Sequence, residues 1–550
     1  MARETQPGRR GPRLTYGMAA AWSVVAILLG YAVLDVADAA PGALTVRPLP
    51  PPPPTETVAT RTLPEVPQPT LSTSVEPPLP SLAGDTAAPS AAGIEQALAS
   101  VRSLPALRDS ALVVRDGQTG EVLLDQGGAE LRIPASTTKL LSAAAIGQSF
   151  APDETLRTVV REGDTPDEIV LVAGGDSLLN PGKGDPDAVA GRAGLRDLAG
   201  QVATALRRSA TTGVTLYVDE TYAAGPATAP TWASTFRSSG ITGAVSMLGL
   251  SSQRAHGGAP GPADPVASVR SAFARQLEAR GIDVRLAARG QAPGVPGSPM
   301  PTPDATEGPS VTPSDGATPR DGRTRTDGAT PPDATASDGA TSAEKAQAPT
   351  TVAAGPTAPA SGPGAVLGTV ESAPVREQLA LALTDSDNAL TEILARQAAY
   401  RSGAGTDFAE VGAWVVSQVA TLGLDTTGVT LSDASGLSRE NRVRASLLSD
   451  VLVLGYDGKH AVLRRALDGL PIGGLTGTLA DRFTGSDHDA AGRARAKTGT
   501  LTGANALAGS VVDDDGRLLV FVGMVAGVGT NDARAALDRL VAAIASCGCR

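Results

Sequence analysis

The sequence predicts an α/β (α+β) fold, with an antiparallel sheet flanked by helices, a helical subdomain and an inserted domain. Strand-like apolar runs followed by helical runs occur near both ends of the folded part of the chain. Short polar motifs interrupt these patterns. Two of the motifs, one ending at Lys139 and one beginning at Ser386, lie 247 positions apart, which is enough for a whole additional domain.

Each end of the folded part predicts a hairpin and a helix. Residues 111–114 and 122–124 read as strands joined by a turn, and a helical run follows them. Residues 506–512 and 518–524 flank a polar turn and precede an amphipathic helix over 531–545. We therefore expect both ends to contribute antiparallel strands and a helix to one sheet.

The predicted domain boundaries follow shifts in composition. Residues 214–218 and 282–286 read as strands of the inserted domain. The segment 294–365 repeats Asp-Ala-Thr and Asp-Gly-Ala-Thr units and has too little apolar content for a core, so we expect a disordered insert. We therefore divide the chain into five segments. Residues 1–40 form a cytoplasmic tip with a signal anchor or signal peptide, and residues 41–91 form a Pro-rich linker. The main domain comprises 92–160 and 366–546, the inserted domain 161–293 and the low-complexity insert 294–365.

The N-terminus predicts export. Four arginines, the last of them Arg13, precede the uncharged stretch from Leu14 to Leu34, whose 21 residues are enough to span a bilayer with the positive end in the cytoplasm. Ala37-Asp38-Ala39 also resembles a signal-peptidase site, so a transmembrane anchor and a cleaved signal both stay open. In either case the folded part is extracytoplasmic, anchored to the membrane or secreted to the cell wall.

Composition excludes several other classes of function. The net charge of −11 and the scattered arginines argue against nucleic acid as a partner. The three histidines are isolated from one another, and no Cys-rich ligand pattern is present, so no metal is implied. Cys547 and Cys549 lie two apart at the C-terminus and are either unpaired or joined in a local disulfide.

The first motif, Ser136-Thr137-Thr138-Lys139, combines a nucleophile with a base. Ser136 falls near the start of an apolar helical run that follows the strand-like 131–133, and residues three apart share a helix face, so the Lys139 amine can reach the Ser136 hydroxyl. The helix N-terminus favours a developing oxyanion. Lys139 needs burial or a cationic neighbour to lower its pKa, and Lys497 is the candidate neighbour.

The second motif, Ser386-Asp387-Asn388, stands directly before the helical run 389–399. From this place the Ser386 hydroxyl can relay a proton to a leaving amine. The Asn388 amide can fix either Lys139 or a substrate carbonyl.

The third motif, Lys497-Thr498-Gly499-Thr500, predicts an edge strand. Gly499 would let a substrate backbone approach closely. Lys497 and Thr498 would hold a substrate carboxylate, and the Thr500 amide would complete an oxyanion hole with the amide of Ser136.

The ordered set of three motifs carries the functional prediction. Ser342-Ala343-Glu344-Lys345 also fits Ser-x-x-Lys, but it lies in Pro/Thr-rich sequence without apolar periodicity, so a single match has little value. The three motifs in order, each in a suitable local pattern, indicate a serine enzyme that activates its nucleophile with lysine and carries out acyl transfer.

On these motifs the chain resembles the low-molecular-mass class C penicillin-binding proteins, the D-alanyl-D-alanine carboxypeptidase/endopeptidases among the penicillin-recognising serine enzymes. The resemblance covers about 93–290 and 366–546. The other similar stretches are 172–176, 218–220, 225–226 with Trp232, 433–439 and 495–500. Ala434 departs from the pattern, since the family usually has glycine there.

The resemblance implies a transpeptidase/β-lactamase-like fold and a penicillin-binding catalytic domain formed by 92–160 and 366–546. It implies peptidoglycan stem peptides as partners, β-lactam antibiotics as inhibitors and no cofactor. It assigns catalysis to Ser136, Lys139, Ser386, Asn388 and Lys497, and substrate binding to Thr498, Gly499 and Thr500.

Two alternatives compete with this interpretation. The first is a β-lactamase of the same superfamily, but Glu392, Glu410 and Glu440 all lack the asparagine four residues on that forms the Glu-x-x-x-Asn deacylation pattern. The second is a non-catalytic penicillin-binding wall protein, against which the intact Ser136 and Lys139 argue.

Overall fold

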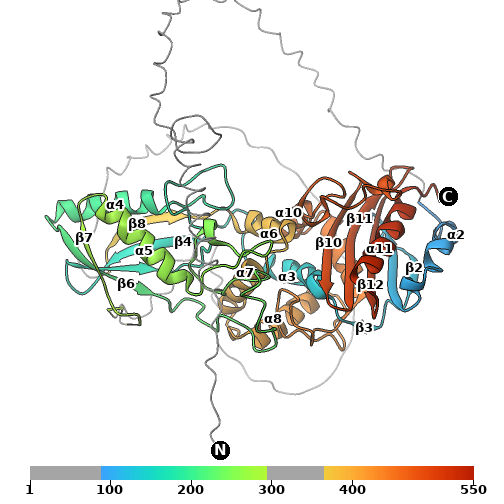
Figure 1. The fold of residues 1–550 in the computed structure, drawn as a ribbon, viewed down its shortest axis with the longest axis horizontal. Coiled ribbons are helices and arrows are strands. Elements are labelled where there is room, and N and C mark those ends of the chain that lie inside the picture. The colour runs from blue at the N-terminus through green and yellow to red at the C-terminus, as the bar shows by residue number, and fades with distance from the viewer. Residues whose placement is uncertain (1–87, 291, 294–363, 550) are drawn as a thin grey trace, which may run out of the picture. The chain divides into compact units, whose positions relative to one another are not determined.

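The computed structural model describes residues 88–290, 292–293 and 364–549 (Figure 1). Within these ranges the strands form two five-stranded sheets and one two-stranded sheet. The predicted membrane span at 14–34, most of the Pro-rich linker and nearly all of the low-complexity insert lie outside the described residues. None of the helices in the described ranges is long and apolar enough to cross a bilayer.

The first sheet joins the two ends of the described chain. Its strand order is β10-β11-β12-β1-β2, and all neighbouring strands are antiparallel. The strands are β1 (Ser110–Asp116), β2 (Val122–Gln126), β10 (Ala494–Leu501), β11 (Ala504–Val512) and β12 (Leu518–Ala526). Since β1 pairs with β12, the N-terminal and C-terminal hairpins form one sheet, as the sequence predicts, and β10 is its edge strand.

Alternation of side chains gives this sheet two apolar faces. Leu112 and Val114 of β1 face a core built with α2 (Ala91–Arg102) and α11 (Thr530–Ala545). Ala111 and Val113 face the opposite core, which the other helices of the main domain complete. Figure 1 shows the sheet between these two groups of helices.

The second group of helices builds the subdomain that carries two of the three motifs. Its helices are α3 (Thr138–Ile146), α6 (Val375–Thr384), α7 (Asn388–Arg401), α8 (Phe408–Thr421), α9 (Ala445–Tyr456) and α10 (Ala461–Asp468). The small sheet pairs β3 (Leu131–Arg132) with β9 (Val443–Arg444). Short 3-10 turns are η1 (Pro105–Leu107), η2 (Ala135–Thr137), η3 (Ser251–Gln253), η4 (Gly477–Leu479) and η5 (His488–Ala490).

The inserted domain contains the second five-stranded sheet, in the order β7-β6-β5-β4-β8. Its strands are β4 (Arg157–Glu162), β5 (Glu168–Val172), β6 (Gly213–Asp219), β7 (Asp283–Leu286) and β8 (Val366–Glu371). β5, β6 and β7 are parallel and are connected through α4 (Leu195–Arg208) and α5 (Pro265–Glu278). Both crossover helices bury their apolar sides in one core with Ile169, Leu171 and Leu216.

This sheet extends past the predicted boundaries of the inserted domain. Composition predicts these boundaries at 161 and 293, but β4 begins at Arg157, and β8 follows the low-complexity insert. β8 pairs with β4 rather than with a strand of the main sheet. Apolar periodicity identifies a strand but not its partner, so local patterns do not separate β8 from the domain that follows it.

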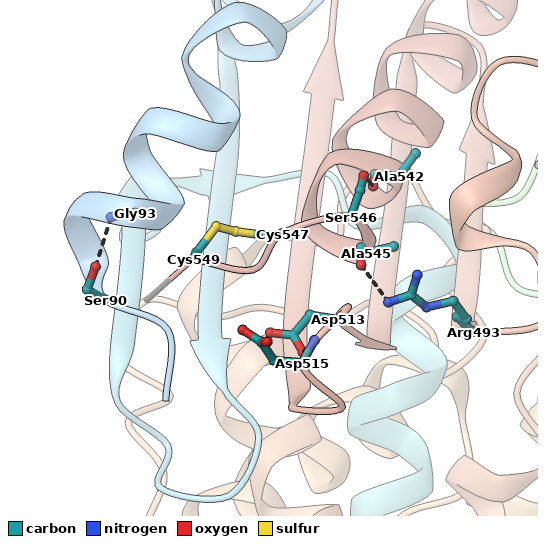
Figure 2. Close-up of a disulfide and its surroundings, with 10 residues drawn as sticks. All are labelled: Ser90, Gly93, Arg493, Asp513, Asp515, Ala542, Ala545, Ser546, Cys547 and Cys549. Carbon is teal, nitrogen blue, oxygen red and sulfur yellow. Dashed lines mark hydrogen bonds between the residues drawn. A yellow bond between two sulfur atoms is a disulfide. The ribbon is translucent and has the colours of Figure 1, made fainter. Parts of the chain in front are cut away.

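The two ends of the described chain lie together at α2 (Figure 2). Cys547 and Cys549 form a disulfide, which selects one of the two alternatives left open by their spacing. The Cys549 carbonyl accepts a hydrogen bond of 2.7 Å from the amide of Ser90, the N-cap of α2. A Cβ on Gly93 would stand 2.8 Å from that same carbonyl oxygen, so glycine permits this close packing of the C-terminal turn on α2.

Candidate active site

Ser136 lies on the 3-10 turn η2, immediately before α3, as the first motif predicts. The residue before it, Ala135, has φ +47°, a left-handed conformation that costs free energy for a residue with a side chain. The Ser136 side chain is half-buried. Its Oγ lies 3.2 Å from Nζ of Lys139, so the predicted contact between residues three apart is present.

The Lys139 amine is fully buried and held by two stronger acceptors. Its Nζ donates to Oδ1 of Asn388 at 2.5 Å and to the carbonyl of Ser435 at 2.7 Å. A neutral amine has two N–H donors and one lone pair. When Lys139 is neutral, these two acceptors take both donors, and the lone pair faces the Ser136 hydroxyl. The geometry is that of a general base.

Burial lowers the pKa of Lys139 to about 8, because the charged amine loses its hydration. The carboxylates of Asp433, Glu392 and Asp387 act in the opposite direction and favour the ammonium form. With this pKa, roughly a tenth of Lys139 is neutral at pH 7 and about half at pH 8. Burial, the first of the two causes considered from the sequence, is therefore the main reason that this lysine can act as a base.

The second motif sits at the start of α7. Ser386 has φ +55°, and Asp387 caps the helix by accepting a hydrogen bond from the Leu390 amide at 2.9 Å. The Asn388 amide nitrogen donates to the Ile241 carbonyl at 2.7 Å, which directs its oxygen toward Lys139. Of the two roles proposed for Asn388, the structure therefore provides the contact with Lys139.

The third motif lies on the edge strand β10, with Lys497 fully buried. Its Nζ donates to Oγ of Ser386 at 2.8 Å and to its neighbour's carbonyl, Thr498 O, at 3.0 Å. Burial lowers the pKa of Lys497 well below its usual value, and the positive charge of Lys139 lowers it further. The second motif thus connects the other two, because Asn388 binds Lys139 of the first motif and Ser386 binds Lys497 of the third.

Gly499 has a structural role that the sequence did not indicate. A Cβ at this position would lie 2.7 Å from the carbonyl oxygen of Pro134, so glycine lets β10 pack directly against the turn that carries Ser136. We expected Gly499 to make room for a substrate backbone. The Thr498 side chain is half-buried and Thr500 is exposed, so both can meet a ligand at the strand edge.

The loop 433–438 completes the site, and sequence reasoning gave it no role. Gly436 has φ +87°, and a Cβ there would stand 1.9 Å from the Ala135 carbonyl oxygen. Asp433 accepts hydrogen bonds from the amides of Gly436 and Ser438 and from the indole nitrogen of Trp232. The turn-forming residues after Leu431 predict only a turn, and the family resemblance of 433–439 marked the segment without indicating which contacts it makes.

Ala434, which departs from the family pattern, fits this loop without distortion. Its carbonyl accepts a hydrogen bond of 2.6 Å from Oγ of Ser142 on α3. Its amide donates to the carboxylate of Glu392 on α7. Both backbone groups are paired, so the methyl group costs the loop none of these contacts.

The inserted domain contacts the second motif directly. The guanidinium group of Arg254 forms ion pairs of 2.9 Å with Asp385 and with Asp387, the residues on either side of Ser386. No group of three or more His, Cys, Asp or Glu side chains suited to a metal ion occurs in the described part of the chain.

Comparison with known proteins identifies relatives over most of the chain. Residues 94–255 and 316–547 match the D-Ala-D-Ala carboxypeptidase 3 (S13) family. Carboxypeptidase DacB of Mycolicibacterium smegmatis is 30% identical over 84% of this chain and 85% of its own length. Carboxypeptidase Rv3627c of Mycobacterium tuberculosis is 30% identical over 88% of this chain and 89% of its own length.

A solved structure supports the fold. The crystal structure of penicillin binding protein 4 (dacB) from Haemophilus influenzae matches with a TM-score of 0.55, and the match covers 82% of this chain and 97% of that protein. The two sequences are 16% identical over this alignment, so the similarity concerns the fold alone.

Proposed function

This chain belongs to the D-Ala-D-Ala carboxypeptidase 3 (S13) family and is a serine-type D-Ala-D-Ala carboxypeptidase, and we propose that Ser136 is its nucleophile and Lys139 its general base. One observation carries this assignment. The two N–H donors of a neutral Lys139 are directed to Asn388 and Ser435, which leaves its lone pair for the Ser136 hydroxyl proton.

Acylation begins when the Ser136 oxygen attacks the carbonyl carbon of the D-alanyl-D-alanine peptide bond. The hydroxyl proton passes to Lys139 as the new C–O bond forms. The amides of Ser136 and Thr500 would stabilise the oxyanion of the tetrahedral intermediate.

Collapse of that intermediate requires a proton for the leaving amine. Ser386 is suited to this step, since Lys497 donates to its oxygen and its own hydroxyl proton can pass to the amine. The C–N bond breaks, D-alanine or the amine of a cross-linked peptide leaves, and the proton held by Lys139 restores the relay. Water then adds to the acyl carbon and gives a proton to Lys139. Lys139 passes that proton to the Ser136 oxygen as the ester C–O bond breaks, and the shortened peptide leaves with its new carboxyl group.

The substrate carboxylate is best placed against the edge strand. Thr498 and Thr500 have side chains available to a ligand, whereas Lys497 is fully buried and acts through its charge and through Ser386. An arriving carboxylate would stabilise the ammonium form of Lys497. Substrate binding and protonation of Lys497 are then linked, which favours a neutral Lys139 in the complex.

The site contains a glutamate near the nucleophile, but its geometry does not suit a β-lactamase. Glu392 is buried, and both of its carboxylate oxygens accept hydrogen bonds from backbone amides. A carboxylate in this position has no access to a deacylating water. We therefore expect the acyl-enzyme formed with penicillin to persist.

The N-terminal span supports a place for the enzyme outside the cytoplasm. We propose that residues 1–40 export the catalytic domain and that the Pro-rich stretch after them spaces it from the membrane toward peptidoglycan. Membrane fractionation of the full chain and of a chain lacking residues 1–40 tests this; recovery of both in the same soluble fraction would contradict an anchor.

Mass spectrometry after incubation with penicillin tests the catalytic assignment. We expect one covalent adduct, located on Ser136, that lasts through many minutes of dilution. Ser136→Ala should form none, whereas Ser342→Ala, in the accidental Ser-x-x-Lys match, should label as fast as the unaltered chain. An adduct elsewhere, or rapid release of hydrolysed antibiotic, would overturn the assignment.

A further inference from the structure

Glu392 is a buried acidic residue that the catalytic steps do not use. It lies on α7, one turn after Asn388, and its side chain is 1% exposed. Its carboxylate accepts hydrogen bonds from the Ala434 amide at 3.1 and 3.2 Å and from the Ser435 amide at 2.7 Å. Both oxygens therefore face donors, as an ionised carboxylate requires.

The residue that Glu392 holds is the residue that holds Lys139. The amide of Ser435 donates to Glu392, and the carbonyl of Ser435 accepts from Nζ of Lys139 at 2.7 Å. Asn388 binds the same amine directly from the same side of α7, since residues four apart share a helix face. One helix thus fixes both acceptors of the base, one directly and one through the 434–435 backbone.

Several charged groups face Glu392. Asp433 lies on the loop packed against it, Arg396 lies one turn further along α7, and Lys139 approaches from α3. Burial and Asp433 raise the pKa of Glu392 to about 7, while the hydrogen bonds from the Ala434 and Ser435 amides lower it, so the carboxylate is ionised near pH 8, where Lys139 loses its proton. In turn, the Glu392 carboxylate favours the ammonium form of Lys139 and opposes the effect of burial.

We propose that Glu392 is a positioning residue for the general base: its carboxylate fixes residues 434–435 so that the Ser435 carbonyl orients the Lys139 amine toward Ser136. This inference rests on the proposed function of Lys139. The negative charge of Glu392 also sets how readily that amine loses its proton, so position and charge have separate effects on the reaction.

Two substitutions separate these effects. Glu392→Gln keeps the size of the side chain and removes its charge. Glu392→Asp keeps the charge but shortens the side chain by one methylene, so the carboxylate lies further from the 434–435 amides. The rate of acylation of Ser136 by penicillin is measured against pH for both. The matched control is Glu440→Gln, which removes an exposed carboxylate from the same loop region.

We expect Glu392→Gln to move the acid limb of the profile to lower pH by about one unit, because Lys139 loses a stabilising negative charge. Its maximal rate should fall roughly tenfold or more, since the amide puts an N–H₂ donor opposite the Ala434 amide in place of the second acceptor oxygen, and the 434–435 backbone that orients the base is held less firmly. Glu392→Asp should lower the maximal rate while the acid limb stays in place. Glu440→Gln should match the unaltered enzyme in both.

A reduced rate with an unmoved acid limb in Glu392→Gln would reduce Glu392 to a packing role and overturn the proposal. An unchanged pH profile in Glu392→Gln would also overturn the proposal. An unchanged maximal rate in Glu392→Asp would do the same, and this variant provides the test if Glu392→Gln does not fold. Failure of the proposed function is recognised separately, because the unaltered enzyme would then form no adduct on Ser136, or Lys139→Met would acylate at the unaltered rate.

Discussion

Two buried lysines in one site cannot both stay charged without a large cost in free energy. Lys139 and Lys497 are each fully shielded from solvent, and burial is the first cause of the lowered pKa of both. Repulsion between the two positive charges also matters, because the charge of Lys139 lowers the pKa of Lys497 further. Burial therefore favours the neutral amine at both residues, and the Lys139 pKa of about 8 makes its neutral, basic form increasingly available as the pH rises toward 8.

Substitution of Lys497 by methionine separates burial from charge. Methionine fills a similar volume, so Lys139 stays shielded from water. We expect the acid limb of the second-order rate constant for penicillin acylation, which reports the free enzyme, to remain near pH 8, where the Lys139 ammonium loses its proton. The maximal rate should fall by roughly 10², the scale of one preorganised electrostatic contact, because Ser386 loses its donor. Stopped-flow acylation across pH measures both.

The control for this variant is Lys459→Met, which alters an exposed lysine and should leave the profile unchanged. A shift of the acid limb by a unit or more in Lys497→Met would show that the charge of Lys497, rather than burial, sets the basicity of Lys139.

At the residue scale, the spacing of side chains along the sequence predicted the chemistry of the site, but it could not predict the contacts made by backbone atoms. The three-residue spacing of Ser136 and Lys139 implied their contact, and the structure places them 3.2 Å apart. The carbonyl of Ser435 has no side-chain signature, so the second acceptor of Lys139 could not be predicted. The close approach at Gly499 involves the Pro134 carbonyl, which spacing along the chain does not indicate either.

At the element scale, the first turn of α7 organises the site. It follows the left-handed residue Ser386, and Asp387 caps it. Arg254 of the inserted domain binds the acidic residues on both sides of Ser386. A backbone held in an unfavourable conformation persists only when its surroundings fix it, and this ion-pair bridge is such a constraint.

Removal of the bridge should loosen the proton relay while the fold survives. In Arg254→Ala we expect the rate of D-alanine release from a D-alanyl-D-alanine peptide to fall roughly tenfold, because Ser386 is less well placed. The melting temperature should fall by a few degrees, since Asp387 is only 8% exposed and loses its cationic partner, whereas Asp385 is partly exposed. Arg237→Ala is the control, because that guanidinium donates to the Ala263 carbonyl within the inserted domain. Equal rates in the two variants would contradict a role for the bridge.

Elements with strong local patterns were predicted well. The hairpins around 111–124 and 506–524 and the C-terminal helix are present, and they share one sheet. The pairing of β8 with β4 was not predicted, because it joins strands separated by most of the inserted domain. Such pairings depend on tertiary packing, which local periodicity does not encode.

At the scale of the whole molecule, the sheet of the inserted domain places a geometric demand on the segment between β7 and β8. These strands occupy opposite edges of the sheet, with three strands between them. Strand spacing of about 4.8 Å separates the edges by about 19 Å. β8 runs parallel to β7, since both β5 and β8 are antiparallel to β4. The connection therefore returns along the strand length as well, and spans roughly 25 Å in all.

A flexible linker of that reach should replace residues 294–363. The composition of this segment gives it too little apolar surface to contribute to a core, so a Gly/Ser linker of roughly 25 residues, with a root-mean-square reach of about 27 Å, should leave the melting temperature and the release of D-alanine from small peptides nearly unchanged. Direct fusion of residue 293 to residue 364 is the matched control. It leaves nine residues between β7 and β8, whose fully extended length of about 30 Å only just exceeds the span. Arg289 would then have to give up its ion pairs with Glu220 and Asp264, so the direct fusion should lower the melting temperature. Loss of folding in the linker variant would mean that the replaced segment packs against the enzyme, and an unaffected direct fusion would mean that the retained residues cover the span without strain.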